Sequence, residues 1–161
     1  MIFPIAFIAT LFLPQIARAV PQACYYPTSP EPSTPEEQFR ITAPLFTAKY
    51  DPDYNSPTGS VGDVACSELA RQFPDFFNVP FFPDVGGAFN TTKDSSHCGA
   101  IWTLTNNANQ VSTHFISIDT TVGSDFGLPF HTFSTLGGNP GAGSLTVKAE
   151  IVGHLGVCKK D

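Results

Sequence analysis

Strict alternation of apolar and polar residues marks the last regular segment of the chain. Over residues 145–152, apolar side chains at every second position alternate with polar ones: Leu145, Val147, Ala149 and Ile151 against Thr146, Lys148 and Glu150. A period of two places the apolar set on one face of an extended chain, so a half-buried strand is predicted here. Residues 45–50 are predicted to form another strand.

Two further strands are predicted at residues 100–105 and 111–118, on either side of Asn106-Asn107-Ala108-Asn109, whose asparagines suit a hairpin turn. Short helices are predicted at residues 67–73, ended by Pro74, and at residues 130–136, with Pro129 as first helical residue and Gly137-Gly138 as stop. Residues 76–83 are predicted to be a loop that ends at Gly86-Gly87. This mixture of short elements predicts a small β-barrel with short helices.

The N-terminus carries a short apolar run, residues 5–13, followed by Ala17-Arg18-Ala19. This pattern is typical of a signal peptide, here residues 1–19, although the first residues lack a basic side chain. The alternative is an uncleaved membrane anchor, but the run is too short to span a bilayer and Pro14 interrupts it. The mature protein is therefore predicted to be secreted, extracellular and free of transmembrane segments.

Residues 20–41 are rich in proline, serine, threonine and glutamate, with prolines at positions 21, 27, 30, 32 and 35. Such a segment cannot donate regularly to a sheet, so it is predicted to be an extended N-terminal tail before a single domain at residues 42–161. Cys24 lies within this tail. A cysteine there suggests that the tail is covalently attached to the domain.

Charge narrows the range of partners. The 161-residue chain has 8 basic and 14 acidic residues, and loss of Arg18 with the signal leaves 7 against 14, a net charge near −7. Nucleic acids and anionic membranes would be repelled by such a chain. The chain has four cysteines and no Cys-x-x-Cys, so in an oxidising compartment two disulfides are favoured over a metal site. We expect no cofactor.

Common enzyme motifs are absent from the sequence, and its four histidines, His97, His114, His131 and His154, are scattered singly. Asp119 is the strongest candidate for chemistry, because it ends an apolar strand before Thr120-Thr121-Val122-Gly123. There it could bind sugar hydroxyls or act as a general acid, and the alternative is a turn-capping aspartate. Hydrolysis of a glycoside usually needs a second carboxylate, for which the candidates are Asp51, Asp53, Asp63 and Asp125.

Aromatic residues near the predicted strand ends offer flat faces on which sugars can pack, with core packing as the alternative: Tyr50, Tyr54, Trp102 and Phe126. The pairs Phe76-Phe77 and Phe81-Phe82 either form an exposed apolar patch suited to interfaces or fold over the core. Asn90-Thr91-Thr92 is an acceptor sequence for N-glycosylation in a secreted chain.

Several segments, taken in order, resemble the cerato-platanin family of small secreted fungal proteins. They are Lys49-Tyr50-Asp51-Pro52-Asp53-Tyr54, Asp63-Val64-Ala65-Cys66-Ser67, Asn78-Val79-Pro80-Phe81-Phe82-Pro83-Asp84-Val85-Gly86-Gly87, Cys98-Gly99, Ile116-Ser117-Ile118-Asp119 and a last strand before Cys158. The resemblance implies a six-stranded double-psi β-barrel, related to the first domain of expansins and to barwin. It also implies chitin-oligomer binding, expansin-like non-hydrolytic loosening of polysaccharide, self-assembly at interfaces, and elicitor, phytotoxin or allergen roles.

The same resemblance implies a carbohydrate-binding set: Tyr50, Asp51, Tyr54, Ser67, Asp119, Asp125 and Phe126. Asp119 matches the aspartate of the family's shallow groove and Phe126 a phenylalanine beside it. The chain departs from the family at Glu68-Leu69-Ala70, where a glycine-rich turn is usual, and at Gly127, where the family has asparagine. Asp125 is the neighbouring residue that could supply the missing acceptor.

The cysteine pairing also follows from the resemblance, which pairs Cys66 with Cys98. The family's next cysteine is replaced here, since Cys98-Gly99 is followed by Ala100-Ile101. Cys158 is therefore expected to pair with Cys24, with free or intermolecular thiols as the alternative.

The leading functional hypothesis is a secreted, non-enzymatic protein that binds cell-wall polysaccharide or chitin oligomers. The second is a weak glycan hydrolase that uses Asp119 with Asp51 or Asp125. The third is a surface-active effector, recognised by a host receptor, whose aromatic loop drives self-association at interfaces.

Overall fold

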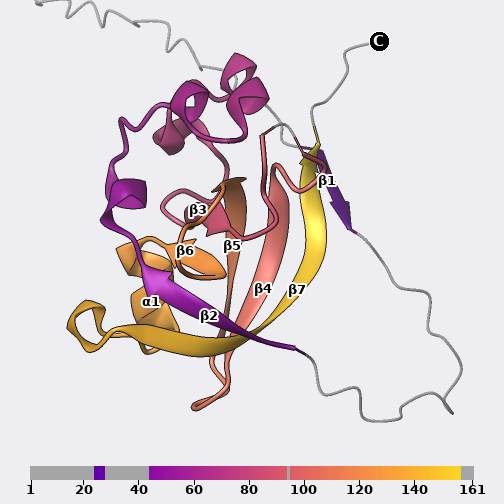
Figure 1. The fold of residues 1–161 in the computed structure, drawn as a ribbon. Helices are drawn as coiled ribbons and strands as arrows, with labels where there is room; N and C mark the ends of the chain where they lie inside the picture. Colours follow the sequence, from indigo (N-terminus) through magenta and orange to yellow (C-terminus); the bar gives the residue numbers. More distant parts are fainter. Residues whose placement is uncertain (1–23, 28–43, 94, 157–161) are drawn as a thin grey trace, which may run out of the picture.

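Six strands close into a barrel in a computed structural model that describes residues 24–27, 44–93 and 95–156 (Figure 1). Around the barrel the order is β7 (Ser144–Gly156), β2 (Leu45–Tyr50), β6 (Phe126–Leu128), β3 (Val85–Ala88), β5 (Ser112–Asp119) and β4 (Ala100–Asn106), and β4 pairs again with β7. The β2–β6 and β3–β5 pairs are parallel and the other pairs antiparallel. The predicted six-stranded barrel with short helices is confirmed.

The long strand β7 holds the barrel together because it pairs along both edges. One edge runs beside β4 from Val147 to His154, and the other pairs with β2 over its first five residues. A further strand, β1 (Cys24–Pro27), pairs with residues 153–156 on the same edge as β2. Four residues of the predicted extended tail therefore pair with the sheet of the domain.

The predicted helices are present but short. The one α-helix among the described residues, α1 (Phe130–Thr135), begins after Pro129, which caps it rather than opening it, and ends before Gly137 at φ 85°. The predicted helix at 67–73 is the 3-10 helix η3 (Ser67–Arg71). The remaining described helices are single 3-10 turns: η1 (Pro52–Asn55), η2 (Val61–Asp63), η4 (Phe76–Asn78) and η5 (Pro140–Ala142). Among the described residues, no helix is long and apolar enough to cross a membrane.

The strands β3 and β6 were not predicted, and glycines explain both their shortness and their position. A Cβ atom on Gly86 would lie 2.4 Å from the carbonyl oxygen of Gly127, and one on Gly87 would lie 2.7 Å from the Tyr54 hydroxyl. The glycines thus let the two strands and the tyrosine approach closely. They also remove the apolar alternation by which a strand is recognised in sequence.

Two apolar cores lie on opposite faces of the sheet. The barrel interior is filled by Ala48, Ala88, Ala100, Trp102, Leu104, Phe115, Phe126, Leu128, Phe133, Leu136 and Val147. The outer core lies beneath residues 54–79, whose 3-10 turns are gathered above β3 and β5 in Figure 1, and consists of Tyr54, Val61, Cys66, Leu69, Phe73, Phe76, Val79, Val85, Ile101, Ile116, Ile118 and Leu155. The outer core positions the segment that forms one wall of the candidate site.

Candidate functional site

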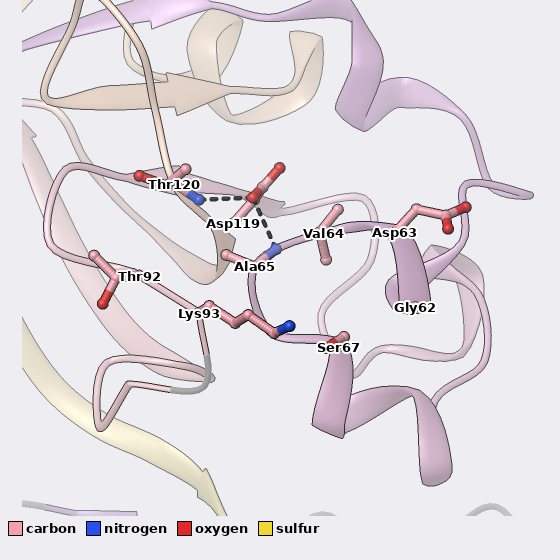
Figure 2. Close-up of a pocket in the computed structure, with 9 residues that line it drawn as sticks. All are labelled: Gly62, Asp63, Val64, Ala65, Ser67, Thr92, Lys93, Asp119 and Thr120. Atoms are coloured by element: carbon pink, nitrogen blue, oxygen red, sulfur yellow. Dashed lines mark hydrogen bonds between the residues drawn. The ribbon is translucent and has the colours of Figure 1, made fainter.

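Asp119 stands at the end of β5 and receives hydrogen bonds at both carboxylate oxygens. Its Oδ1 accepts from the backbone N–H groups of Ala65 at 2.9 Å and Thr120 at 2.8 Å (Figure 2). Its Oδ2 accepts from the Tyr54 hydroxyl at 3.3 Å. These donors come from three separate segments of the chain. The carboxylate therefore ties the strand end to the η1 and η2–η3 segments and is itself held in one orientation.

Tyr54 lies directly behind this carboxylate. Its side chain is only 4% exposed and packs over the glycine pair Gly87 and Gly127 of β3 and β6. Burial, together with the negative charges of Asp119 and Asp51, raises the pKa of the Tyr54 phenol well above its usual range. The phenol is therefore a permanent hydrogen-bond donor to Asp119.

A groove of about 450 Å³ opens in front of Asp119. Its walls combine small apolar residues with hydroxyl and charged side chains, and no aromatic ring is found among the described lining residues: Gly62, Asp63, Val64, Ala65, Ser67, Thr92, Lys93, Asp119 and Thr120. One wall is the segment between η2 and η3, and the facing wall is the loop that follows β3. Lys93 extends across the groove toward Ser67 (Figure 2).

The disulfide between Cys66 and Cys98 joins these two walls. Cys66 lies between the lining residues Ala65 and Ser67, and Cys98 belongs to the loop that carries Thr92 and Lys93, with a Cα–Cα distance of 5.3 Å. The Cys66–Cys98 pairing is confirmed. The second expected bridge joins Cys24 to Cys158; Cys158 lies outside the described residues, so this bridge stays a prediction.

Two of the predicted carbohydrate-binding residues, Asp119 and Ser67, line the groove, and Tyr54 lies behind it. Asp51 accepts a hydrogen bond from the Asp53 N–H and so caps η1. Tyr50 is turned away: its hydroxyl accepts from Asn55 at 2.8 Å and its ring contacts those of Phe130 and Phe133. Neither Asp51 nor Tyr50 is a lining residue.

Asp125 and Phe126 have structural roles and do not line the groove. The Asp125 carboxylate accepts a 2.7 Å hydrogen bond from the Thr47 N–H and fixes the start of β6 against β2. Phe126 has no exposed surface and packs inside the barrel against Phe46, Phe89, Trp102 and Phe115. The expectation that Phe126 lies on the groove side is therefore corrected: the ring faces the interior and cannot contact a surface ligand.

Several lining residues were missed by sequence reasoning, chiefly Thr92, Lys93 and Thr120. Thr120 adjoins Asp119, so proximity in sequence could have indicated it. Thr92 and Lys93 lie in a loop whose position depends on the Cys66–Cys98 bridge. The cysteine pairing, followed a few residues back along the chain from Cys98, was the one available signal for them.

Two further pairs of titratable residues, Asp84 with His131 and His154 with His97, are not among the lining residues of the groove. The Oδ1 atom of Asp84 lies 2.8 Å from Nδ1 of His131 and accepts a 2.7 Å hydrogen bond from the Thr132 hydroxyl. Both partners belong to α1. His154 on β7 is half-buried near His97, and burial and that neighbour lower the pKa of His154. Within the described ranges, no three His, Cys, Asp or Glu side chains gather in a way that could hold a metal ion.

The fold and the groove define a class of protein, namely small disulfide-bonded β-barrels with an open surface groove. The sequence model of the cerato-platanin family matches residues 46–153, more than half of the chain. The chain belongs to the cerato-platanin family, as its motifs predicted.

Individual relatives agree with this assignment. The chain is 39% identical over 69 residues to Cerato-platanin of Ceratocystis fimbriata f. sp. platani, and 36% identical over 76 residues to Allergen Asp f 15 of Aspergillus fumigatus. These matches cover 40% and 44% of this chain and about half the length of each relative, 51% and 49%.

Solved structures of the family are similar over more of the chain. Cerato-platanin 2 from M. perniciosa is similar with a TM-score of 0.61 and 28% identity, over 68% of this chain and 94% of that one. The solution structure of the fungal elicitor Cerato-Platanin is similar with a TM-score of 0.57 and 34% identity, over 66% of this chain and 90% of that one.

Proposed function

We propose that this protein is secreted to the extracellular space or fungal cell wall and binds cell-wall glycans, in particular chitin oligomers, without hydrolysing them. The observation that carries the proposal is the groove at Asp119, in which a carboxylate held by backbone N–H groups lines the same space as Ser67, Thr92 and Lys93. Sugars present hydroxyl and acetamido groups, which pair with donors and acceptors of this kind. Because the chain belongs to the cerato-platanin family, the proposal also includes expansin-like loosening of polysaccharide and elicitor or toxin roles.

A non-hydrolytic role is supported by how the carboxylates are used. Glycoside hydrolysis normally needs one carboxyl group that gives up a proton and a second one across the scissile bond. Asp119 accepts hydrogen bonds at both oxygens, and the partners suggested for it, Asp51 and Asp125, are bonded to the backbone N–H groups of Asp53 and Thr47. Asp63 is the other carboxylate among the described lining residues.

The test is calorimetric titration of the full mature chain with chitin and cellulose oligomers, followed by a reducing-end assay on the same mixtures. Binding without release of reducing ends supports the proposal, and release that is lost in Asp63→Asn or Asp119→Asn supports the hydrolase. Trp102 fluorescence, the simplest optical probe, is unsuitable. The indole is 4% exposed inside the barrel and donates to the Ser117 hydroxyl at 3.2 Å.

Lys93→Ala is expected to weaken oligomer binding about fivefold, because an exposed charged hydrogen bond contributes about 1 kcal/mol. Lys93 is the better probe of the groove than Asp119. Its side chain is exposed and has no hydrogen bond or ion pair with another described residue, whereas loss of the Asp119 carboxylate would leave Tyr54 and Ala65 without an acceptor. Lys148→Ala, on β7 and outside the groove, is the matched control and should bind as the wild type does. Equal affinity of all three proteins would contradict the assignment of the groove.

A specific observation also favours surface activity as a second function. Of the two phenylalanine pairs, Phe76 is buried and Phe82 packs on the outer core, but Phe77 is 68% and Phe81 54% exposed. Phe81 also has φ 71°, a left-handed conformation that costs a phenylalanine of the order of 1–2 kcal/mol. Strained residues of this kind are concentrated at functional sites, and here the strain accompanies an exposed aromatic ring.

The double variant Phe77→Ser with Phe81→Asn is expected to form weaker films at an air–water interface than the wild type at equal concentration. Asparagine is chosen because it tolerates the left-handed backbone, so the variant should keep the fold, and relief of the Phe81 strain should raise the free energy of unfolding by no more than about 1–2 kcal/mol. Phe130→Ser removes a ring that is 54% exposed on α1 and serves as control. Film formation that falls equally in the control would mean that general hydrophobicity, and not this loop, is responsible.

A further inference from the structure

The turn that follows β3 carries the sequence Asn90-Thr91-Thr92. The chain leaves the sheet after Phe89, whose N–H donates to the Asp125 carbonyl at 2.7 Å. It then turns through hydrogen bonds from the Thr91 N–H to Ala88 and from the Thr92 N–H to Asn90. The turn is therefore an ordered part of the described structure, and it presents Asn90 and Thr92 at the surface end of β3 while Thr91 is buried.

The side chain of Asn90 is half-buried, and its Oδ1 is fully buried without a hydrogen-bond partner. Since Oδ1 faces the protein, the exposed part of the side chain leaves Nδ2 on the solvent side. No hydrogen bond joins this Nδ2 to another described residue, so a substituent on it would break none of them. The Thr92 side chain, two residues on, is exposed.

We infer that Asn90 is an N-glycosylation site of this protein. An Asn-x-Thr sequence with a non-proline centre is the acceptor pattern, and here it meets an accessible turn. In the reaction, Nδ2 of Asn90 forms a bond to C1 of N-acetylglucosamine in a lipid-pyrophosphate-linked oligosaccharide. The bond from C1 to the pyrophosphate oxygen breaks, the lipid pyrophosphate leaves, and the amide proton passes to the base of the transferase. The inference rests on the secretion included in the proposed function.

The position of the glycan follows from the neighbours of the acceptor. Thr92 and Lys93 are lining residues of the groove, so a glycan on Asn90 stands at its rim. On the other side, Phe89 immediately precedes the acceptor and is 43% exposed, while its ring stacks on Phe46 at 5.4 Å. A glycan on Asn90 would therefore lie between the groove and the exposed part of Phe89, on which a sugar ring can pack.

The test is secretion of the full chain from a yeast in two forms, one with its own residues 1–19 and one with a host leader in their place. Intact mass is measured before and after treatment with peptide N-glycosidase, which converts a glycosylated asparagine to aspartate. The expected result is an oligosaccharide mass on the wild type, mapped to the peptide that contains Asn90. The mass is absent from Asn90→Gln and Thr92→Ala and present on Thr92→Ser, which keeps the acceptor pattern.

Unmodified Asn90 in the protein secreted with the host leader would overturn the inference, provided that a co-expressed control glycoprotein is modified. The Thr92→Ala and Thr92→Ser pair keeps the test independent of any folding defect at position 90. Failure of secretion is distinguishable from failure of glycosylation. If the native leader alone does not export the chain, the proposed secretion fails while the host-leader form still reports on Asn90.

Discussion

Replacing Phe126 by alanine is expected to lower the free energy of unfolding by about 3–5 kcal/mol, the range for a buried phenylalanine. Phe126 has no exposed surface, and its ring makes edge-to-face contacts with Phe46, Phe89, Trp102 and Phe115 at centroid distances of 5.7, 5.9, 5.2 and 5.6 Å. Removal of the ring leaves a cavity in the barrel interior and ends all four contacts. Urea unfolding, followed by circular dichroism, measures the change.

Two further measurements decide between a core role and a groove role for this ring. Phe130→Ala removes a half-exposed phenylalanine and should cost no more than about 1 kcal/mol, which makes it the matched control. If Phe126→Ala unfolds like the wild type but loses affinity for chitin oligomers, the ring faces the groove and the packing described above is wrong. We expect the opposite pattern, with oligomer affinity retained at temperatures where the variant is folded.

The regular strands were predictable because their apolar residues alternate. Leu145, Val147, Ala149 and Ile151 all face the interior core of the barrel, as their spacing indicates. The hairpin at 106–109 was predictable from its asparagines, and the structure places β4 and β5 on either side of it. In these segments local sequence and tertiary packing require the same arrangement, so a pattern of a few residues is sufficient.

The strands β3 and β6 could not be predicted because they are three or four residues long and contain glycines. What keeps them in the sheet is a long-range contact, the approach of Gly86 and Gly87 to Gly127 and Tyr54. The position of Phe126 likewise depends on long-range packing. Its place near a predicted strand end suggested a surface position, but the closure of the barrel turns it inward.

The site was predictable only in part, for a related reason. Asp119 and Ser67 belong to recognisable motifs, and both line the groove. Lys93 belongs to no motif, and it reaches the groove because the loop after β3 is tied to η3 by Cys66 and Cys98. Which phenylalanine of each pair is exposed also depends on packing, because Phe76 belongs to the outer core and Phe82 packs against it. Phe77 and Phe81 stay more than half exposed.

Loss of the Cys66–Cys98 bridge is expected to destabilise the protein by about 3.5 kcal/mol and to disorganise the groove. The sequence separation is 32 residues, and closing a loop of this size in the unfolded chain gives that magnitude in the chain-entropy model. The appropriate variant is Cys66→Ala with Cys98→Ala. Cys66 is fully buried in the outer core, where a serine would place an unpaired hydroxyl and so lower the free energy of unfolding further.

The local effect of this variant should be confined to the groove, because the bridge joins its two walls while the barrel interior has separate packing. Amide chemical shifts of Ser67, Thr92 and Lys93 are therefore expected to move, and the fluorescence of the buried Trp102 to stay as in the wild type. Cys98→Ala alone removes the bond but keeps the buried Cys66 side chain, so equal destabilisation of the single and double variants assigns the loss to the bond. A loss below about 1 kcal/mol in both variants, with unchanged shifts at Thr92 and Lys93, would show that the outer core holds the walls of the groove without the disulfide.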